Sequence, residues 1–542
     1  MGVPGRYSVS RPDTRSPEPA PNTERAFRCQ ATPALDPGRE HDACGVGFVA
    51  HAGGERSHAV LQMALTAVAR LAHRGAASND HSGDGAGVLT QIPQQLFAQA
   101  GVTGPLAVGM FFLPQADPEL ERAVALIEDV LGEMDQPVVG WRDVPIDPTA
   151  LGPLARGNCP TIRQAFVAPP PNQSNRGSDD AWERRLYVAR RAIERRAGSA
   201  VYVSSLSCRS IVYKALLTGT ELPTFYPDLR APWFETAIAV FHQRYSTNTQ
   251  PSWPLAQPFH LLAHNGEINT LWGNRNAMRA REAKLPAALR PVIWEGGSDS
   301  ASLDNALELL VRSGRDPVHA LMMLVPEAWE GANDLEIDPA LRAFYQFHAP
   351  LMEPWDGPAA LAFSDGAIAG AAVDRNGLRP CRYKVTKSRL VIACSEVGVA
   401  DLDPADVVES GRLGPGELLV VDTTRNAVLH SAGRNARWPR VAPMRPGRAA
   451  SPRTSSPAGR TRHRRSPPKI SYRGSAPSAT ASRTCVTCSS PWRRRGPTRS
   501  GAWGTTRRFL HSRSRGQVSM PTCASGSPRS QTPRSIRCAR PA

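Results

Sequence analysis

The chain has 542 residues, 41% of them hydrophobic, and a formal net charge of +17. The excess charge lies in residues 441–542, which hold 21 Arg, one Lys and no acidic residue, whereas residues 1–440 carry a net charge of −5. No apolar run approaches the ~18 residues of a membrane helix, and ten scattered cysteines do not form a disulfide scaffold. We therefore expect a protein of the reducing cytoplasm with a mildly acidic body.

Residues 1–43 are rich in Pro, Arg and Ser and lack the apolar core of a signal peptide, so we predict a disordered leader. A short apolar strand, Gly45–Ala50, follows at once. The stretch SHAVLQMALTAVARLAHRG then repeats apolar residues at helical spacing and ends at Gly75, where a helix stop is expected. The SGDGAG stretch at 82–87 lacks the lysine of a P-loop, and we interpret it as a flexible loop that could serve as a lid.

Further elements are predicted along the body. Residues 236–246 and 259–269 are typical of buried strands, the second running into a turn at Asn265-Gly266. Residues 300–314 have the pattern of an amphipathic helix, and short strands alternate with turn signals from Ala359 to His430, as in an antiparallel sheet. The pattern indicates an α+β fold rather than a parallel doubly wound sheet.

The tail, residues 435–542, differs in composition from the body. Leu, Ile, Val and Phe make up only 7 of its last 102 residues, too few for a core. The mixture of Arg, Pro, Ser, Ala and Gly favours an out-of-frame translation of a GC-rich gene. A basic arm that binds nucleic acid and an ordinary linker are the alternatives.

Cys44 is the first candidate for chemistry. A cysteine attacks as its thiolate, so something must accept its proton, and His41 is the only nearby side-chain base. Cleavage between Ala43 and Cys44 would instead create an α-amine with a pKa of about 7.7–8, close to working pH. The alternative is a buried structural cysteine at a strand start.

Three further positions carry candidate groups. Arg244 ends a strand, where it could bind a carboxylate bidentately or form a surface salt bridge. Asn265 and Gly266 could supply an oxyanion hole or a plain tight turn. Asp299 could bind a substrate ammonium or merely cap a helix.

No metal is predicted. His73, His81, His242 and His264 form no zinc pattern. The CVTC stretch at 485–488 has no second cysteine pair at a suitable spacing.

Five groups of motifs occur along the chain in the order and spacing found in one protein family. They are ACGVGFVA, LAHRGA with SGDGAG, HQRYSTNTQPSWPLAQPFHLLAHNGEINTLWGN, GGSDSASLDNALELL, and PWDGPAALAFSDG with DRNGLRPCRY. From about His41 to Ser431 the chain resembles the amino-terminal glutaminase domain of the glutamate synthase large chain. The resemblance implies a class II glutamine amidotransferase over residues 44–434, with the four-layer α/β/β/α sandwich of N-terminal nucleophile hydrolases and a propeptide over residues 1–43.

The resemblance also implies residue roles. Cys44 would attack the amide of L-glutamine, with its own α-amine as base. Asn265 and the Gly266 N–H would hold the oxyanion. Arg244 would bind the substrate α-carboxylate, and Asp299 its α-ammonium.

The resemblance further implies what the complete family enzyme contains. Synthase domains, FMN, an iron–sulfur cluster, a small reductase subunit and NAD(P)H or ferredoxin as electron donor belong to the full-length enzyme, and we expect no cofactor in this chain. A truncated or frameshifted product is therefore expected. The alternatives are another class II amidotransferase, a tail that binds nucleic acid, and an inactive fragment; nucleic acid and membrane are not expected partners.

Overall fold

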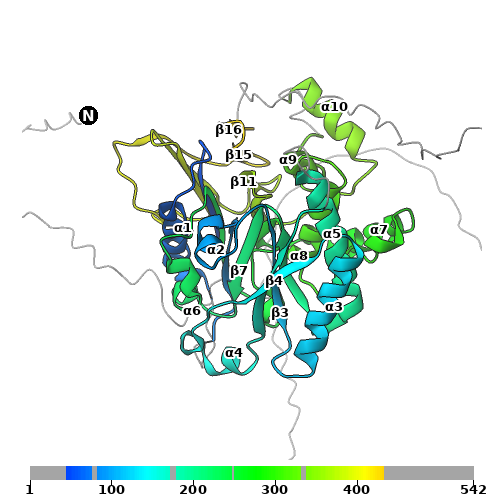
Figure 1. Cartoon of the computed structure of the whole chain (residues 1–542). Helices are drawn as coiled ribbons and strands as arrows, with labels where there is room; N and C mark the ends of the chain where they lie inside the picture. Colours follow the sequence, from blue (N-terminus) through cyan, green and yellow to red (C-terminus); the bar gives the residue numbers. More distant parts are fainter. Residues whose placement is uncertain (1–43, 76–81, 171–178, 247–248, 331–336, 432–542) are drawn as a thin grey trace, which may run out of the picture. The chain divides into compact units, whose positions relative to one another are not determined.

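The computed structural model describes residues 44–75, 82–170, 179–246, 249–330 and 337–431 (Figure 1). All of them belong to the first of the two units, 1–449 and 450–542, into which the chain divides. The predicted leader lies outside the described residues, and so does the predicted tail. The propeptide and frameshift hypotheses therefore stay predictions.

The largest sheet has seven strands, and every neighbouring pair is antiparallel. In spatial order they are β14 (Val407–Arg412), β12 (Arg382–Thr386), β13 (Leu390–Cys394), β1 (Gly45–His51), β8 (Ile238–Gln243), β2 (Ala86–Gln91) and β7 (Ser210–Ala215). The predicted strand at Gly45–Ala50 is therefore β1, at the centre of this sheet.

A second, five-stranded antiparallel sheet packs against the first. Its strands are, in spatial order, β16 (Ala427–His430), β15 (Leu418–Asp422), β11 (Ile368–Val373), β10 (Ala359–Ser364) and β9 (Leu262–Gly266). Because side chains alternate along a strand, Phe48 of β1 and Ala362 of β10 meet in the core between the sheets, whereas Val49 and Leu361 point outward to the helices.

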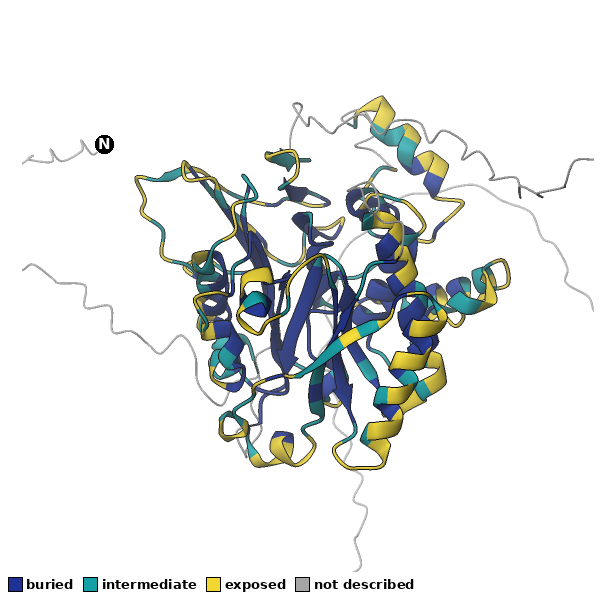
Figure 2. Cartoon of the chain, in the orientation of Figure 1, coloured by how far each residue is buried: buried dark blue, intermediate teal, exposed yellow. Residues whose placement is uncertain are grey.

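Helices cover the two outer faces. The helix α1 (His58–Arg70) packs its apolar side on β1 and β8. On the other side, α7 (Leu271–Glu282), α8 (Asp299–Arg312) and α9 (Pro317–Leu324) share a core with β10. The order of layers is thus α/β/β/α, which confirms the predicted fold class. Figure 2 shows the strands buried between helices that expose their outer sides.

A third sheet, which the sequence pattern did not reveal, extends the fold beside β7. It contains β4 (Val138–Asp143), β5 (Thr161–Val167), β3 (Ala107–Leu113) and β6 (Tyr202–Ser207), in that order. The helices α3 (Glu119–Glu133) and α5 (Asp179–Ala197) cover it and lie side by side in Figure 1. The remaining helices are α2 (Gln94–Gln99), α4 (Pro153–Gly157), α6 (Leu222–Phe225) and α10 (Pro339–His348).

Predicted and observed elements agree in kind and differ at their ends. The predicted helix that ends at Gly75 is α1 followed by a 3₁₀ turn at Ala72–Arg74, and Ser57 caps its start. The strands predicted at 236–246 and 259–269 are β8 and β9. The antiparallel strands predicted after Ala359 are β10 to β16, but they divide between the two sheets, with β12, β13 and β14 in the seven-stranded sheet and the others in the five-stranded one. Within the described ranges, no helix is long and apolar enough to span a membrane.

Candidate active site

Cys44 lies directly before β1. The Tyr245 backbone N–H donates to its Sγ at 3.2 Å, and Sγ lies 3.4 Å from the Tyr245 carbonyl oxygen. Burial raises the pKa of the thiol, the Tyr245 contact and the charge of Arg244 offset part of that rise, and the carboxylates of Asp299 and Asp84 add to it. A thiol in this state needs a base before it can attack.

The sequence offered His41 as a side-chain base for Cys44, but His41 lies outside the described residues. Gly45, the first residue of β1, packs closely against Leu71 at the end of α1. A Cβ at Gly45 would lie only 2.8 Å from Leu71 Cβ, so a larger residue would not fit there. Glycine at position 45 therefore allows the start of β1, and with it Cys44, to lie close to α1.

Arg244 follows β8 and exposes only 4% of its surface. Its guanidinium donates to the Asp84 carbonyl oxygen at 3.2 Å and to Thr249 Oγ1 at 2.7 Å, and its backbone N–H donates to the Gly85 carbonyl oxygen at 2.8 Å. A surface salt bridge does not describe this buried side chain. Burial lowers the Arg244 pKa, with nearby Asp84 acting against that shift, so an incoming carboxylate would find a poorly solvated cation.

The stretch 82–87 supports Arg244 and differs from the predicted flexible loop. Ser82 and Asp84 are 5% and 8% exposed, and β2 already begins at Ala86. Asp84 Oδ2 accepts a hydrogen bond from the Ser246 backbone N–H at 2.5 Å. Burial raises the Asp84 pKa, although the Ser246 contact and the charge of Arg244 lower it in part.

Asn265 and Gly266 are the last two residues of β9, so the predicted tight turn at this position is wrong. Asn265 is 2% exposed, and its Oδ1 has no hydrogen-bond partner among the described residues. Gly266 has φ 150°, and any Cβ there would collide with the Pro358 carbonyl oxygen. Only glycine fits at this position.

Asp299 is the first residue of α8, but Ser298 caps that helix by accepting from the Ala301 backbone N–H at 3.1 Å. Asp299 instead bridges two segments. Its Oδ2 accepts from the Ile268 backbone N–H at 2.9 Å, and its Oδ1 accepts from the Ser300 backbone N–H at 2.7 Å. The carboxylate is therefore fixed beside the chain that leaves β9.

Topology brings these segments to one place. Gly45 pairs with Gln243, so the next residues outward, Cys44 and Arg244, face each other at the ends of β1 and β8. The strand β9 packs across β1 and β8 from the second sheet. Sequence reasoning named no role for Asp84 or for the Tyr245 backbone, because the fold alone brings them to Cys44.

Comparison of the sequence with known protein families identifies the family of this chain. The profile described as "Glutamine amidotransferases class-II" matches residues 44–443.

The chain belongs to the class II glutamine amidotransferases.

Its sequence relatives include glutamate synthases. The amidotransferase is 47% identical over 408 residues to "Ferredoxin-dependent glutamate synthase 2" of Synechocystis, a match that covers 72% of this chain and 26% of that one. It is 41% identical to "Glutamate synthase [NADPH] large chain" of Bacillus subtilis, with 72% and 26% covered, and 44% identical to "Glutamate synthase [NADH]" of Saccharomyces cerevisiae, with 72% and 19% covered. The chain thus spans about a quarter or less of the length of these relatives.

Among solved structures, the glutamine phosphoribosylpyrophosphate amidotransferase of B. subtilis matches with a TM-score of 0.27 and 14% identity, over 61% of this chain and 50% of that one. The structure described as the allosteric regulatory enzyme of purine biosynthesis matches with a TM-score of 0.31 and 12% identity, over 71% and 48%.

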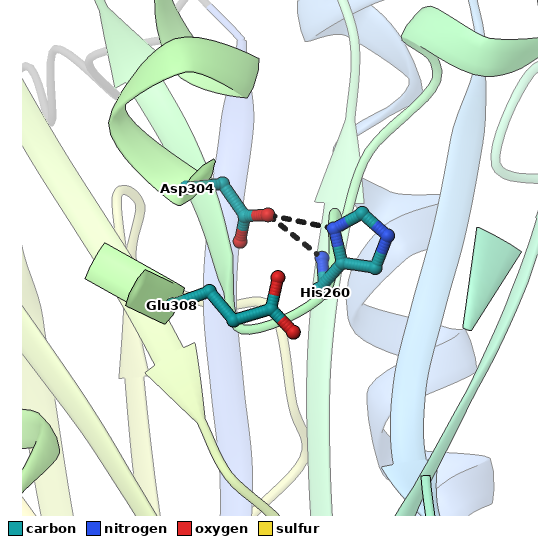
Figure 3. Close-up of side chains that lie close together, drawn as sticks. All are labelled: His260, Asp304 and Glu308. Atoms are coloured by element: carbon teal, nitrogen blue, oxygen red, sulfur yellow. Dashed lines mark hydrogen bonds and ion pairs between the residues drawn. The ribbon is translucent and has the colours of Figure 1, made fainter. Parts of the chain in front are cut away.

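The amidotransferase holds one further cluster with the composition of a metal site. His260, Asp304 and Glu308 place one ligand atom each within 4.8 Å of one another (Figure 3). Asp304 Oδ2 accepts from His260 Nδ1 at 2.9 Å and from the His260 backbone N–H at 3.2 Å. The Arg190 guanidinium lies 2.9 Å from His260 Nε2 and also pairs with Glu308. Because a buried cation already satisfies this group, we interpret it as a structural ion network.

Proposed function

We propose that residues 44–434 hydrolyse L-glutamine to glutamate and ammonia through a thioester on Cys44. The observation that carries the proposal is the position of this thiol. It lies directly before the central strand, is held by a backbone amide, and lies within reach of the charges of one buried arginine and one fixed carboxylate. The family profile also starts at this residue.

In the proposed first step, Cys44 Sγ attacks the carbonyl carbon of the substrate carboxamide. The oxygen becomes an oxyanion, which would be stabilised by the Asn265 side-chain amide and the Gly266 N–H. One oxyanion donor is worth about 10²–10³ in rate. Collapse of this intermediate breaks the C–N bond, releases ammonia and leaves the glutamyl thioester, which water then hydrolyses to glutamate.

The base in this proposal is the α-amine of Cys44 after cleavage at Ala43–Cys44. Burial raises the thiol pKa, and Arg244, Asp299 and Asp84 are the charged side chains that act on it. The α-amine that cleavage would create is a base with a reference pKa of about 7.7–8, close to working pH. It would take the thiol proton, pass it to the leaving ammonia, and then activate water.

Substrate recognition would use charges at both ends of glutamine. The Arg244 guanidinium would bind the α-carboxylate, and the Asp299 carboxylate would bind the α-ammonium. A site that buries two such partners rejects molecules that lack either group, because one buried charge would then be left unpaired.

We infer that the ammonia serves glutamate synthesis from 2-oxoglutarate, because the relatives at 41–47% identity are named glutamate synthases. The candidate ligand cluster in the described ranges contains no cysteine, so an iron–sulfur cluster does not fit it. We assign FMN and the iron–sulfur cluster to the parts of the longer synthases that this chain does not contain. NAD(P)H or ferredoxin and the small reductase subunit would be partners of those complete enzymes. We place the reaction in the cytoplasm, without membrane or nucleic acid.

The test begins with the intact mass and amino-terminal sequence of the purified full chain. A protein that starts at Cys44 and releases ammonia from glutamine, with a Cys44→Ala variant that does not, is the expected result. Cys159→Ala is the matched control, because Cys159 is another free, half-buried thiol, and it should stay active. A protein that starts at Cys44 but neither turns over glutamine nor reacts at Cys44 with an electrophilic glutamine analogue would overturn the proposal.

A further inference from the structure

His264 is a buried titratable residue that the proposed mechanism does not use. It lies on β9 directly before Asn265, and its side chain is fully enclosed, with 0% exposure. His264 Nδ1 is 2.8 Å from Ser300 Oγ and 4.0 Å from Asp299 Oδ2. The imidazole therefore lies between the residues proposed to hold the oxyanion and the carboxylate proposed to bind the substrate ammonium.

The backbone of His264 is fixed on both sides. Its N–H donates to Gln257 Oε1 at 2.8 Å. Its carbonyl oxygen lies 3.1 Å from His242 Nε2 and accepts from Gln257 Nε2 at 3.4 Å. These contacts fix the backbone from which the ring extends, and the ring itself is held by its buried hydrogen bond to Ser300.

Ser300 connects the imidazole to the carboxylate. Its Oγ lies 3.1 Å from Asp299 Oδ1 as well as 2.8 Å from His264 Nδ1, and the hydroxyl has a single proton to donate. Donation to the carboxylate is the stronger, charge-assisted choice, and it requires that Nδ1 of His264 carries a proton and donates to Ser300. Nε2 has no hydrogen-bond partner among the described residues, but the Pro358 backbone carbonyl acts on the ring and raises its pKa in part.

Burial, more than the surrounding charges, favours the neutral form of the ring. Burial is the largest influence and lowers the His264 pKa. The carboxylate of Asp299 on α8 acts against this, whereas Arg379 on the connection from β11 to β12 adds to it. His242 on β8 contacts the His264 carbonyl oxygen, and burial lowers the pKa of His242 to about 3, so it stays neutral as well.

We propose that His264 is a positioning residue for glutamine binding: its neutral imidazole orients Asp299 through Ser300 and leaves the carboxylate charge free for the substrate α-ammonium. Protonation of His264 places a cation beside Asp299 and weakens glutamine binding without touching the reacting atoms. The inference rests on the proposed function, because it assigns the partner of Asp299 from it.

The kinetic test compares the pH dependence of KM and kcat in the full chain and in His264→Asn. An asparagine amide reaches the position of Nδ1 and can bond Ser300, but it does not titrate. In the wild type, KM should rise only at a pH below 6.5, the ordinary histidine pKa, because burial lowers the pKa of His264 and moves its protonation to lower pH. In His264→Asn, KM should stay nearly constant over that range, while the acid limb of kcat stays the same in both proteins. Identical KM profiles would overturn the inference.

Ser300→Ala provides a second variant that leaves the histidine in place. Removal of the hydroxyl should raise KM about tenfold or more with kcat changed much less, because a hydrogen bond to a charged group is lost. A fall in kcat with KM unchanged would contradict the positioning role.

A measurement independent of turnover separates the two proposals. In the full chain with ¹⁵N-labelled histidine, the signal that disappears in His264→Asn reports the ring of His264. It should stay neutral, with the proton on Nδ1, down to a pH below 6.5, its ordinary pKa. A ring that titrates at or above that value overturns the inference even in an active enzyme. Absence of glutamine hydrolysis with a neutral ring would instead reject the proposed function.

Discussion

Replacement of Arg244 by lysine tests the proposed carboxylate site most directly. The guanidinium is buried, and it points two nitrogen atoms at neutral oxygens of Asp84 and Thr249. Lysine keeps the charge but cannot make the planar, two-pronged contact with a carboxylate. Loss of a charge-assisted hydrogen bond costs about 1.5–3 kcal/mol, so Arg244→Lys should raise KM for glutamine about ten- to a hundredfold.

The assay is steady-state ammonia release with glutamine and with glutaminamide, which lacks the α-carboxylate. The wild type should discriminate strongly between the two substrates, and Arg244→Lys should discriminate much less. Arg70→Lys is the matched control, because Arg70 pairs with Asp401 at the surface, and its kinetics should be unchanged. Equal discrimination by wild type and Arg244→Lys would refute the reasoning, provided that both proteins unfold at similar temperatures.

Three further predictions follow from close packing and buried charge. Gly266→Ala should lower kcat by about 10²-fold, because the Cβ collides with a backbone carbonyl and shifts an oxyanion donor, whereas Gly132→Ala, with open space at its Cβ, should be neutral in the same assay. Glu308→Gln should lower the free energy of unfolding in urea by about 1.5–3 kcal/mol, since it removes one of the two carboxylates that pair with the buried Arg190 cation and leaves only Glu194; an unchanged midpoint would contradict this. Burial raises the Asp304 pKa, but the neighbouring imidazole and backbone N–H groups lower it further than that, to a net value below normal. The charged carboxylate therefore stabilises the fold at neutral pH, this stability is lost as the pH falls through the folded-state pKa, and Asp304→Asn should lose less stability between about pH 7 and about pH 3 than the wild type.

The sequence predicted the elements whose pattern is local. The strand at Gly45–Ala50 and the helix that follows it have clear periodicity, and the structure contains both within a few residues. The sequence pattern did not reveal the third sheet because its strands pair across long stretches of intervening chain, as Gly109 does with Leu206 and Ala107 with Val167. Such pairing leaves no signal in a short window of sequence.

The candidate site was predictable only in part. Cys44, Arg244 and Asp299 stood out because each is a reactive or charged residue at the end of an apolar element. The interpretation of Asn265-Gly266 as a turn failed because the collision with a neighbouring strand, which requires glycine there, depends on β10 and its preceding loop. The support that Asp84 gives to Arg244 depends in the same way on the pairing of β2 with β8.

The central position of β1 has a consequence for the order of its first residue. Chain ends normally fray, and fixing the backbone of one residue costs about 1–2 kcal/mol in conformational entropy. Here β1, the strand that follows Cys44, is hydrogen-bonded to β13 on one side and to β8 on the other. Cleavage before Cys44 would therefore create a chain terminus with the low mobility of a central strand. Amide hydrogens of β1 should exchange with solvent as slowly as those of the core. Folding alone would then position the terminal amine to act as a base before any substrate binds.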